Sequence, residues 1–206
     1  MKTAERRENL KERLIHAAER TIASHGLGGL RARALAYRVG CAVGAIYNVV
    51  ADLDELILFV NSRTIAELER AVGAASAGQK SSQNADEAVA RLVQLSIVYT
   101  DFAATHTQRW RALFEHRLPE GRPLPDWYSQ EQMRLFSFVE EPLKVLQPNA
   151  SPKRIALLAR SLVSAVHGIV MLGLEEKLYT RPLTSLREQV TFVVSAIGRG
   201  LAAPAS

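Results

Sequence analysis

Residues 30–48, LRARALAYRVGCAVGAIYN, constrain the fold of this chain more than any other stretch. The apolar spacing predicts a helix over residues 31–39, and Gly40 follows it where a helix end needs a left-handed residue. A second short helix is predicted to begin at Val43. Two short helices joined by three or four residues with a glycine at the corner form a helix-turn-helix. The same pattern occurs at corners of ordinary helical bundles, so the sequence leaves both interpretations open.

The second of these two helices carries mostly small side chains. Its apolar side is predicted to consist of Val43, Ile46 and Tyr47. Small residues let a backbone come close to a base-pair edge or a phosphate, and here they are Val43, Gly44, Ala45 and Asn48. Three arginines flank the helix with positive charge: Arg31, Arg33 and Arg38.

The net charge of +5 lies entirely on the segment that holds this helix pair. Residues 1–48 contain nine Lys and Arg against four Glu, whereas residues 49–206 contain 17 basic and 17 acidic side chains. Positive charge gathered in this way indicates a surface that binds a polyanion. A solvated charged face is the alternative, and it leaves the neutrality of the remainder unexplained.

Length and composition predict one large or two small domains of a cytoplasmic protein. A chain of 206 residues with 48% hydrophobic side chains can bury a sizeable core. Residues 1–7 carry charges with no apolar stretch behind them, so we expect no signal peptide. The longest apolar run, residues 169–174, is too short to span a bilayer, and no membrane partner is expected. The single cysteine, Cys41, cannot form an internal disulfide and is interpreted as a small buried hydrophobe.

Apolar periodicity predicts an all-helical chain without a β-sheet. A capping box of Asp52 and Glu55 is expected to open the fourth helix, and residues 78–83 read as a linker. Besides the short helix from residue 43, the expected helices cover residues 4–25, 31–39, 52–77, 85–105, 108–118, 126–146, 151–179 and 183–201.

The last two predicted helices are apolar nearly all round, which sets them apart from the others. A helix without a polar face must be covered on both sides. A two-fold homodimer through residues 152–179 and 183–201 would cover them, with two helices from each subunit in a four-helix interface. The alternative is a core that lies entirely within one chain.

Residues 10–60 resemble the N-terminal domain of the TetR family of one-component transcriptional regulators. The matching elements share one register and are Ala17-Ala18, Gly26, Leu35-Ala36, Gly40-Cys41-Ala42-Val43-Gly44-Ala45-Ile46-Tyr47-Asn48 and Asp52-Leu53-Asp54-Glu55-Leu56. The resemblance implies a three-helix helix-turn-helix DNA-binding domain over residues 1–51 and a helical ligand-binding and dimerisation bundle over residues 52–206. It also implies a repressor that leaves a pseudo-palindromic operator when an apolar or amphipathic small-molecule effector binds.

Four positions depart from the family's pattern. Ala42 and Arg31 stand where the family has Ser or Thr helix caps, and losing such a cap costs about 1 kcal/mol. Leu53 replaces a lysine that commonly contacts a DNA phosphate in the family, and Val50 replaces the usual Phe. These departures affect the expected phosphate contacts rather than the fold.

The residues expected to contact DNA fall into two groups. Lys2, Arg6 and Arg7 precede the first apolar stripe and are predicted to form a mobile arm that binds DNA. The resemblance implies that the helix-turn-helix supplies the others, with Tyr47 donating to a phosphate and Arg33 facing the major groove. The full second group is Arg31, Arg33, Ala42, Val43, Gly44, Ala45, Tyr47 and Asn48.

Aromatic residues gather in the central third of the sequence, where helical spacing usually indicates a core. The resemblance implies instead that some of them line an effector pocket with His167: Tyr99, Phe102, Trp110, Phe114, Trp127 and Phe136. Residues 155–178 resemble the C-terminal domain of a subgroup marked by a Trp and a His-Gly pair, although Val163 stands at the Trp position. His167 is either a hydrogen-bonded core residue or a pocket residue, and it needs a partner if it is buried.

Neither catalysis nor a metal or cofactor is indicated by the sequence. The five histidines show no ligand spacing with Cys, Asp or Glu, and no Ser, His and acid form a nucleophile setting. A helical ligand-binding or adaptor protein without sequence-specific DNA binding is the main alternative, and it would not need +5 on residues 1–48. An all-helical enzyme would need a convergent set of titratable groups, which this sequence does not offer.

Overall fold

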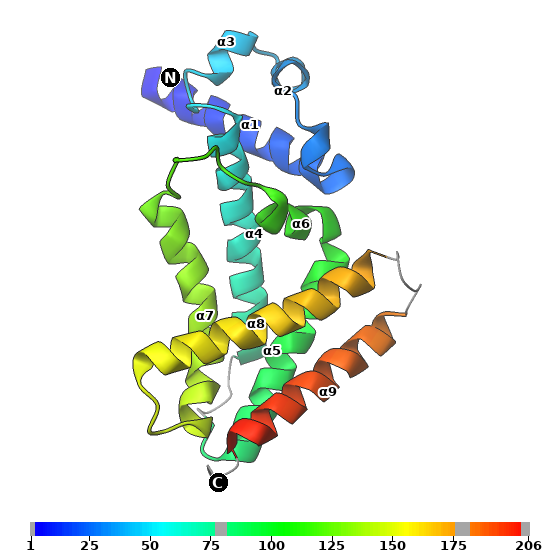
Figure 1. Ribbon diagram of the computed structural model, residues 1–206. Helices are drawn as coiled ribbons and strands as arrows, with labels where there is room; N and C mark the ends of the chain where they lie inside the picture. Colours follow the sequence, from blue (N-terminus) through cyan, green and yellow to red (C-terminus); the bar gives the residue numbers. More distant parts are fainter. Residues whose placement is uncertain (1–2, 77–81, 176–181, 203–206) are drawn as a thin grey trace. The chain divides into compact units, whose positions relative to one another are not determined.

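A computed structural model describes residues 3–76, 82–175 and 182–202, and its regular elements are all helical (Figure 1). Within these residues the chain forms nine α-helices and one 3-10 helix, with no β-strand. The predicted all-helical fold is therefore confirmed. In chain order the elements are α1 (Thr3–His25), η1 (Leu27–Gly29), α2 (Ala32–Val39), α3 (Val43–Ile46), α4 (Leu53–Ser76), α5 (Ala85–Thr105), α6 (Thr107–Glu115), α7 (Asp126–Leu146), α8 (Pro152–Leu174) and α9 (Leu183–Ala202).

Most predicted helix bounds agree with the observed ones to within a residue. The prediction for residues 108–118 runs too far, because α6 ends at Glu115 and His116 is already extended ahead of Pro119. The prediction for residues 151–179 also runs too far, since α8 ends at Leu174; residues 176–179 lie outside the described residues. Residues 78–81 of the predicted linker lie outside them as well.

Contacts group the chain into two compact units. The N-terminal unit comprises Met1–Ala66 with His106–Ser129, and the C-terminal unit comprises Glu67–Thr105 with Gln130–Ser206. Helices α4 and α7 each contribute residues to both units. Helix α6 packs on α1 and η1 and so belongs with the helix-turn-helix, which the sequence did not indicate. The predicted domain division between residues 51 and 52 stays a prediction.

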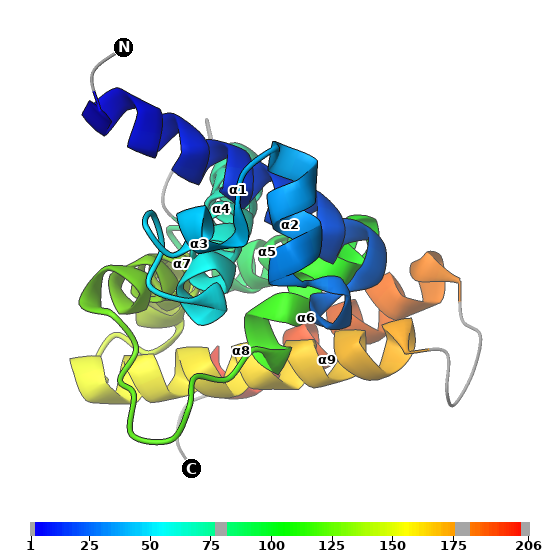
Figure 2. The ribbon, with the colours of Figure 1, turned by 90° about the horizontal axis from the view of Figure 1, so that it is seen from above.

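The N-terminal unit is built around one apolar core. Helix α1 contacts α2 and α6, and α2 contacts α3; Figure 2 shows α1, α2 and α3 from above. Helix α1 ends at His25, and the Gly26 that follows has a φ of 64°, in the left-handed region that residues with a side chain disfavour. The core residues are Leu14, Ile15, Ala17, Ala18, Ile22, Leu30, Leu35, Ala36, Val39, Ile46, Val50, Leu56, Ile57, Val60 and Ala112.

The C-terminal unit packs α9 along α5, with α8 against both (Figure 1). Gly198 of α9 permits the close approach to α5, because an added Cβ would lie 2.9 Å from a Val89 methyl carbon. Helix α8 buries one stripe of its surface: Ile155, Ala159, Leu162, Val166 and Val170. Helix α9 buries Leu186, Val190, Val194 and Gly198.

The opposite faces of α8 and α9 keep large apolar residues exposed. They are Leu157 and Leu172 on α8 and Phe192 on α9, with Phe192 75% exposed, and Ile197 is 36% exposed at the edge of the buried stripe of α9. By length and composition α8 could cross a membrane, with a mean hydropathy of 1.9 over its most apolar window. A packed helix of a globular protein passes the same test, and α8 contacts two neighbouring helices.

Candidate nucleic-acid interface

The corner between α2 and α3 has the geometry that the sequence predicts. Gly40 has φ 67° and ψ 46°, in the left-handed region. Its N–H donates to Tyr37 O at 3.2 Å, and the N–H of Cys41 donates to Ala36 O at 3.0 Å. These two bonds satisfy the last carbonyls of α2 in a Schellman motif and fix the direction in which the chain leaves the helix. Cys41 is half-buried and packs against the core, as a small hydrophobe would.

Helix α3 is a single turn anchored by one side chain. Ile46 is fully buried, whereas Val43 is 39% and Tyr47 49% exposed. Of the three residues on the predicted apolar side, only Ile46 is buried, whereas Val43 and Tyr47 keep much of their surface exposed. Ala42, Gly44 and Asn48 are exposed and Ala45 is half-buried. The surface of α3 thus consists of methyl groups, bare backbone, one phenol and one amide.

The structure confirms that α2 and α3 lack side-chain N-caps. Ala42 and Arg31 occupy the N-cap positions of α3 and α2, and neither makes a side-chain cap hydrogen bond. The missing caps leave both helices to be held by packing and by the Gly40 turn. Arg31 is exposed, and its guanidinium donates to the carbonyl of Leu30 at 2.8 Å. Arg33 is exposed one turn before Tyr37, on the outer side of α2.

Two arginines of the basic segment have internal partners. Arg13 of α1 donates to the carbonyl of Val39, the last residue of α2. Arg38 of α2 donates at 3.1 Å to the hydroxyl of Thr21 on α1, and that hydroxyl donates to Ala17 O at 2.8 Å. Arg38 therefore ties α2 to α1, in addition to supplying the flanking charge that the sequence assigned to it.

The predicted mobile arm is wrong for the part of it that the structure describes. Arg6 and Arg7 are exposed, but they lie inside α1, which begins at Thr3. Helix-forming residues with acidic side chains in the first turns favour this extension, because acids stabilise a helix N-terminus. Lys2 lies outside the described residues.

The start of α4 is capped by Asp52, the residue before it, and Asp52 pairs with Arg122 from the loop between α6 and α7. Asp52 accepts from the N–H of Glu55 at 2.8 Å, which confirms the Asp52 half of the capping box. The Glu55 carboxylate accepts from the N–H of Ala51 rather than that of Asp52. The N–H of Glu55 and the Arg122 guanidinium lower the pKa of Asp52 below its usual value.

His116, from the same loop, packs beside this helix start. Its side chain is buried, and Nε2 lies 3.7 Å from a carboxylate oxygen of Asp54. Burial lowers the pKa of His116, which opposes the effect of the nearby Asp54 charge. Burial of His116 therefore favours the neutral form of the imidazole.

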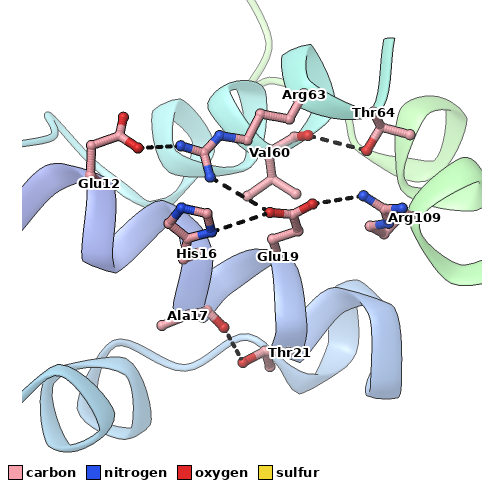
Figure 3. Close-up of polar contacts among 9 residues, drawn as sticks. All are labelled: Glu12, His16, Ala17, Glu19, Thr21, Val60, Arg63, Thr64 and Arg109. Atoms are coloured by element: carbon pink, nitrogen blue, oxygen red, sulfur yellow. Dashed lines mark hydrogen bonds and ion pairs between the residues drawn. The ribbon is translucent and has the colours of Figure 1, made fainter. Parts of the chain in front are cut away.

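A polar network joins α6 and α4 to α1 inside the N-terminal unit (Figure 3). Glu19 of α1 accepts from Arg109 Nη1 at 2.7 Å, and Arg63 Nη1 lies 3.6 Å from the other carboxylate oxygen. Arg63 also pairs with Glu12, and His16 Nδ1 lies 3.8 Å from Glu19. These contacts hold α6 on the helix that supports α2.

The Arg109–Glu19 pair is the part of the network that is largely shielded from water. The side chain of Arg109 is 10% exposed and that of Glu19 19%. Arg109 Nη2 donates to His106 Nδ1 at 2.8 Å, so that nitrogen carries no proton. Beside the network, Asn61 of α4 donates to the carbonyl of Ala112 in α6 at 3.2 Å. The contacts between different helices could not be predicted from the sequence, because their members lie more than 40 positions apart.

The predicted effector residues are divided between the two units. Tyr99, Phe102, Phe136 and His167 belong to the C-terminal unit, whereas Trp110, Phe114 and Trp127 belong to the N-terminal unit. Trp110 is fully buried, with its ring centroid 5.5 Å from that of Phe114. Trp127 stacks on Phe59 of α4 at the same centroid distance. These two tryptophans therefore pack against aromatic residues within the N-terminal unit.

The Tyr99 hydroxyl and His167 Nδ1 lie 2.9 Å apart, so His167 has the hydrogen-bond partner that a buried histidine needs. Burial lowers the pKa of His167 and so favours the neutral ring. No group of three or more His, Cys, Asp or Glu that could hold a metal ion occurs among the described residues.

Comparison with known proteins decides the family. The model of the C-terminal domain of tetracyclin repressor-like proteins matches residues 92–197. This chain belongs to the TetR family. TetR-family proteins are transcription regulators that bind DNA and small-molecule effectors as dimers; they are not enzymes as a class.

Relatives agree with this assignment in sequence and in fold. HTH-type transcriptional regulators of Mycobacterium tuberculosis and Mycobacterium bovis are 26% identical over 130 residues, 62% of this chain. This TetR-family chain spans about half the length of the curated relatives that it matches.

Solved structures share the helical arrangement over nearly the whole chain. A Rhodococcus sp. RHA1 protein described as of unknown function superposes with a TM-score of 0.72 at 20% identity, covering 94% of this chain and 96% of its own. A putative TetR-family transcription regulator from Shewanella sp. PV-4 has a TM-score of 0.64 at 15% identity, covering 91% and 97%. At such identities these likenesses concern the fold alone.

Proposed function

We propose that this TetR-family protein is a cytoplasmic transcriptional repressor that binds a pseudo-palindromic operator as a homodimer. The observation that carries the proposal is the surface of α3, which lies within the basic segment of residues 1–48: Ile46 is buried, whereas Val43, Gly44 and the following Tyr47 are exposed. Small exposed side chains suit the edges of base pairs, and positive charge suits phosphates. The proposed contacts are Arg6, Arg7, Arg31, Arg33, Ala42, Val43, Gly44, Ala45, Tyr47 and Asn48, with Lys2 outside the described residues.

The homodimer is proposed to form through α8 and α9. Their exposed residues Leu157, Leu172, Phe192 and Ile197 are large and apolar, and a monomer gains by burying such residues against a partner. An isologous two-fold contact lets one pair of helices cover the same pair on a second copy. Two copies also present two α3 helices, as an operator with two half-sites requires.

An apolar or amphipathic effector is proposed to bind the C-terminal unit and to release the operator. Tyr99, Phe102, Phe136 and His167 are the residues of the predicted pocket set that this unit contains. A ligand can act on DNA binding only through different affinities for the DNA-competent and released arrangements. For a hundredfold loss of operator affinity, this coupling must be about 2.7 kcal/mol.

Selection of duplexes from a random pool by the full chain tests the proposed function. We expect a pseudo-palindromic sequence to be enriched and to bind at least about 1000-fold more tightly than a scrambled duplex at fixed salt. Equal binding of selected and scrambled duplexes would favour the alternative, a helical ligand-binding or adaptor protein without sequence-specific DNA binding.

Two matched variants locate the interface. Gly44→Glu places a carboxylate on the exposed face of α3, where an added Cβ meets nothing within 4 Å. Leu124→Glu makes the same change of charge at an exposed position of the loop before α7. We expect the first to abolish operator binding and the second to retain it. Equal losses in both would show that net charge, and not α3, determines binding.

A further inference from the structure

The face of α3 lacks the side chains that most often read base pairs through hydrogen bonds. Arginine and lysine usually recognise guanine, glutamine and asparagine adenine, and carboxylates cytosine. Residues 42–48 contain no charged side chain and no glutamine, and asparagine occurs once, at Asn48. The exposed positions at the start of α3 are instead Ala42, Val43 and Gly44. These offer methyl groups and bare backbone.

The local geometry holds these methyl groups in place. The Schellman turn at Gly40 and the buried Ile46 fix α3 at both ends. Val43, in the first helical position, is 39% exposed, and its branched side chain has one strongly preferred rotamer in a helix. At Gly44 an added Cβ would meet nothing within 4 Å, so the surface there is open to an approaching groove.

We propose that α3 recognises the C5-methyl groups of thymine in each operator half-site, with Val43 as the principal contact, Ala42 at its edge and Gly44 allowing close approach. The thymine methyl is the one apolar feature that a base pair presents in the major groove of unmodified DNA. It is therefore the natural partner of an apolar reading surface. This inference rests on the proposed DNA-binding function and specifies its ligand.

Replacing thymine by deoxyuridine in the selected operator tests the inference, because it removes the methyl group and leaves every hydrogen-bonding group in place. Burying one methyl contributes a factor of about four in affinity. We expect at least one thymine in each half-site at which the substitution weakens binding by about this factor, measured by fluorescence anisotropy at fixed salt. Uniform insensitivity to deoxyuridine would overturn the inference.

A double-mutant cycle connects the base to the residue. Val43→Ala removes two methyl groups from an exposed position and replaces them with the best helix former, so the fold is retained. On this variant the deoxyuridine substitution should lose most of its effect. Leu124→Ala, an exposed aliphatic truncation in the loop before α7, should leave the effect unchanged.

The outcomes separate this inference from the function on which it rests. If the wild-type chain enriches no duplex, the proposed DNA-binding function fails. If it enriches an operator whose deoxyuridine sensitivity is the same in wild-type and Val43→Ala protein, the assignment to Val43 fails while DNA binding stands.

Discussion

Neutralising Glu19 should lower the free energy of unfolding of the N-terminal unit by more than the loss of an exposed ion pair would. In Glu19→Gln the Arg109 guanidinium keeps its position but loses the carboxylate 2.7 Å away, with only 10% of its side chain exposed. His106, whose Nδ1 accepts from Arg109, carries no negative charge and so does not replace the carboxylate. Breaking a fully buried ion pair by removing one partner costs about 3–5 kcal/mol, whereas exposed pairs contribute about 0.2–1 kcal/mol. Because this pair is largely but not wholly buried, we expect a loss of about 2–3 kcal/mol.

Urea unfolding of the full chain measures this loss as a lower midpoint at unchanged slope. The matched control is Glu12→Gln, which removes the same charge from the same helix. Its partner Arg63 retains Glu19, and the Glu12 side chain is 48% exposed. We therefore expect Glu12→Gln to cost less than about 1 kcal/mol.

A second variant separates the ion pair from other effects of the substitution. Arg109→Met keeps most of the apolar length of the arginine and removes the cation. When it is combined with Glu19→Gln, the cation that has lost the Glu19 carboxylate is removed as well, so the double variant should be more stable than Glu19→Gln alone. Strictly additive losses, or equal losses in Glu19→Gln and Glu12→Gln, would refute this account of the network.

Four further predictions concern the proposed interface, the dimer and the titration of buried histidines. Gly44→Ala should raise the melting temperature, because glycine costs a helix about 1 kcal/mol relative to alanine, and yet weaken operator binding by blocking close approach; an unchanged affinity would place α3 away from DNA. Tyr47→Phe should weaken binding to every duplex alike, since phosphate contacts position rather than specify; wild-type affinity and salt dependence would contradict that role. Phe192→Glu should shift the chain to monomers in analytical ultracentrifugation without loss of helicity, and a persistent dimer would contradict the proposed interface. The pKa values of His116 and His167 are lowered by burial, so the unfolded chain takes up protons first as pH falls below about 6.5. Stability should therefore fall between pH 6.5 and the lowered folded values, and His116→Gln with His167→Gln should flatten this dependence in thermal melts.

Local chemistry explains why the helix-turn-helix could be predicted from sequence. The Gly40 turn depends on one residue's freedom at positive φ, and the capping of α4 depends on two residues three positions apart. Helix bounds follow from apolar spacing that repeats within each segment. Each of these sequence patterns lies within a few residues of the turn, cap or helix that it predicts. Tertiary packing agrees with these local preferences and does not override them.

The features that could not be predicted depend on contacts between distant segments. Nothing near Glu19 in sequence indicates that Arg63 and Arg109 will meet its carboxylate, or that α6 will join the helix-turn-helix. Similarly, Trp110 and Trp127 carried the same aromatic signal as Tyr99, although packing places them in the other unit. The arm was mispredicted for a different reason: Arg6 and Arg7 lie inside the helix that the sequence also predicts from residue 4, and they are therefore ordered with α1.

The structure also changes what the charge surplus of residues 1–48 means for DNA binding. Arg13 donates to the end of α2, Arg38 donates to Thr21, and Lys11 lies 3.8 Å above the ring of Phe59. Among the cations of this segment that the structure describes, these three contact a neighbouring helix, and each helps to hold α1 against α2 or α4. Every phosphate contact contributes about 0.9 to the slope of log affinity against log salt. The slope per subunit should therefore reflect about six cations or fewer, while the other three position the helices that carry them.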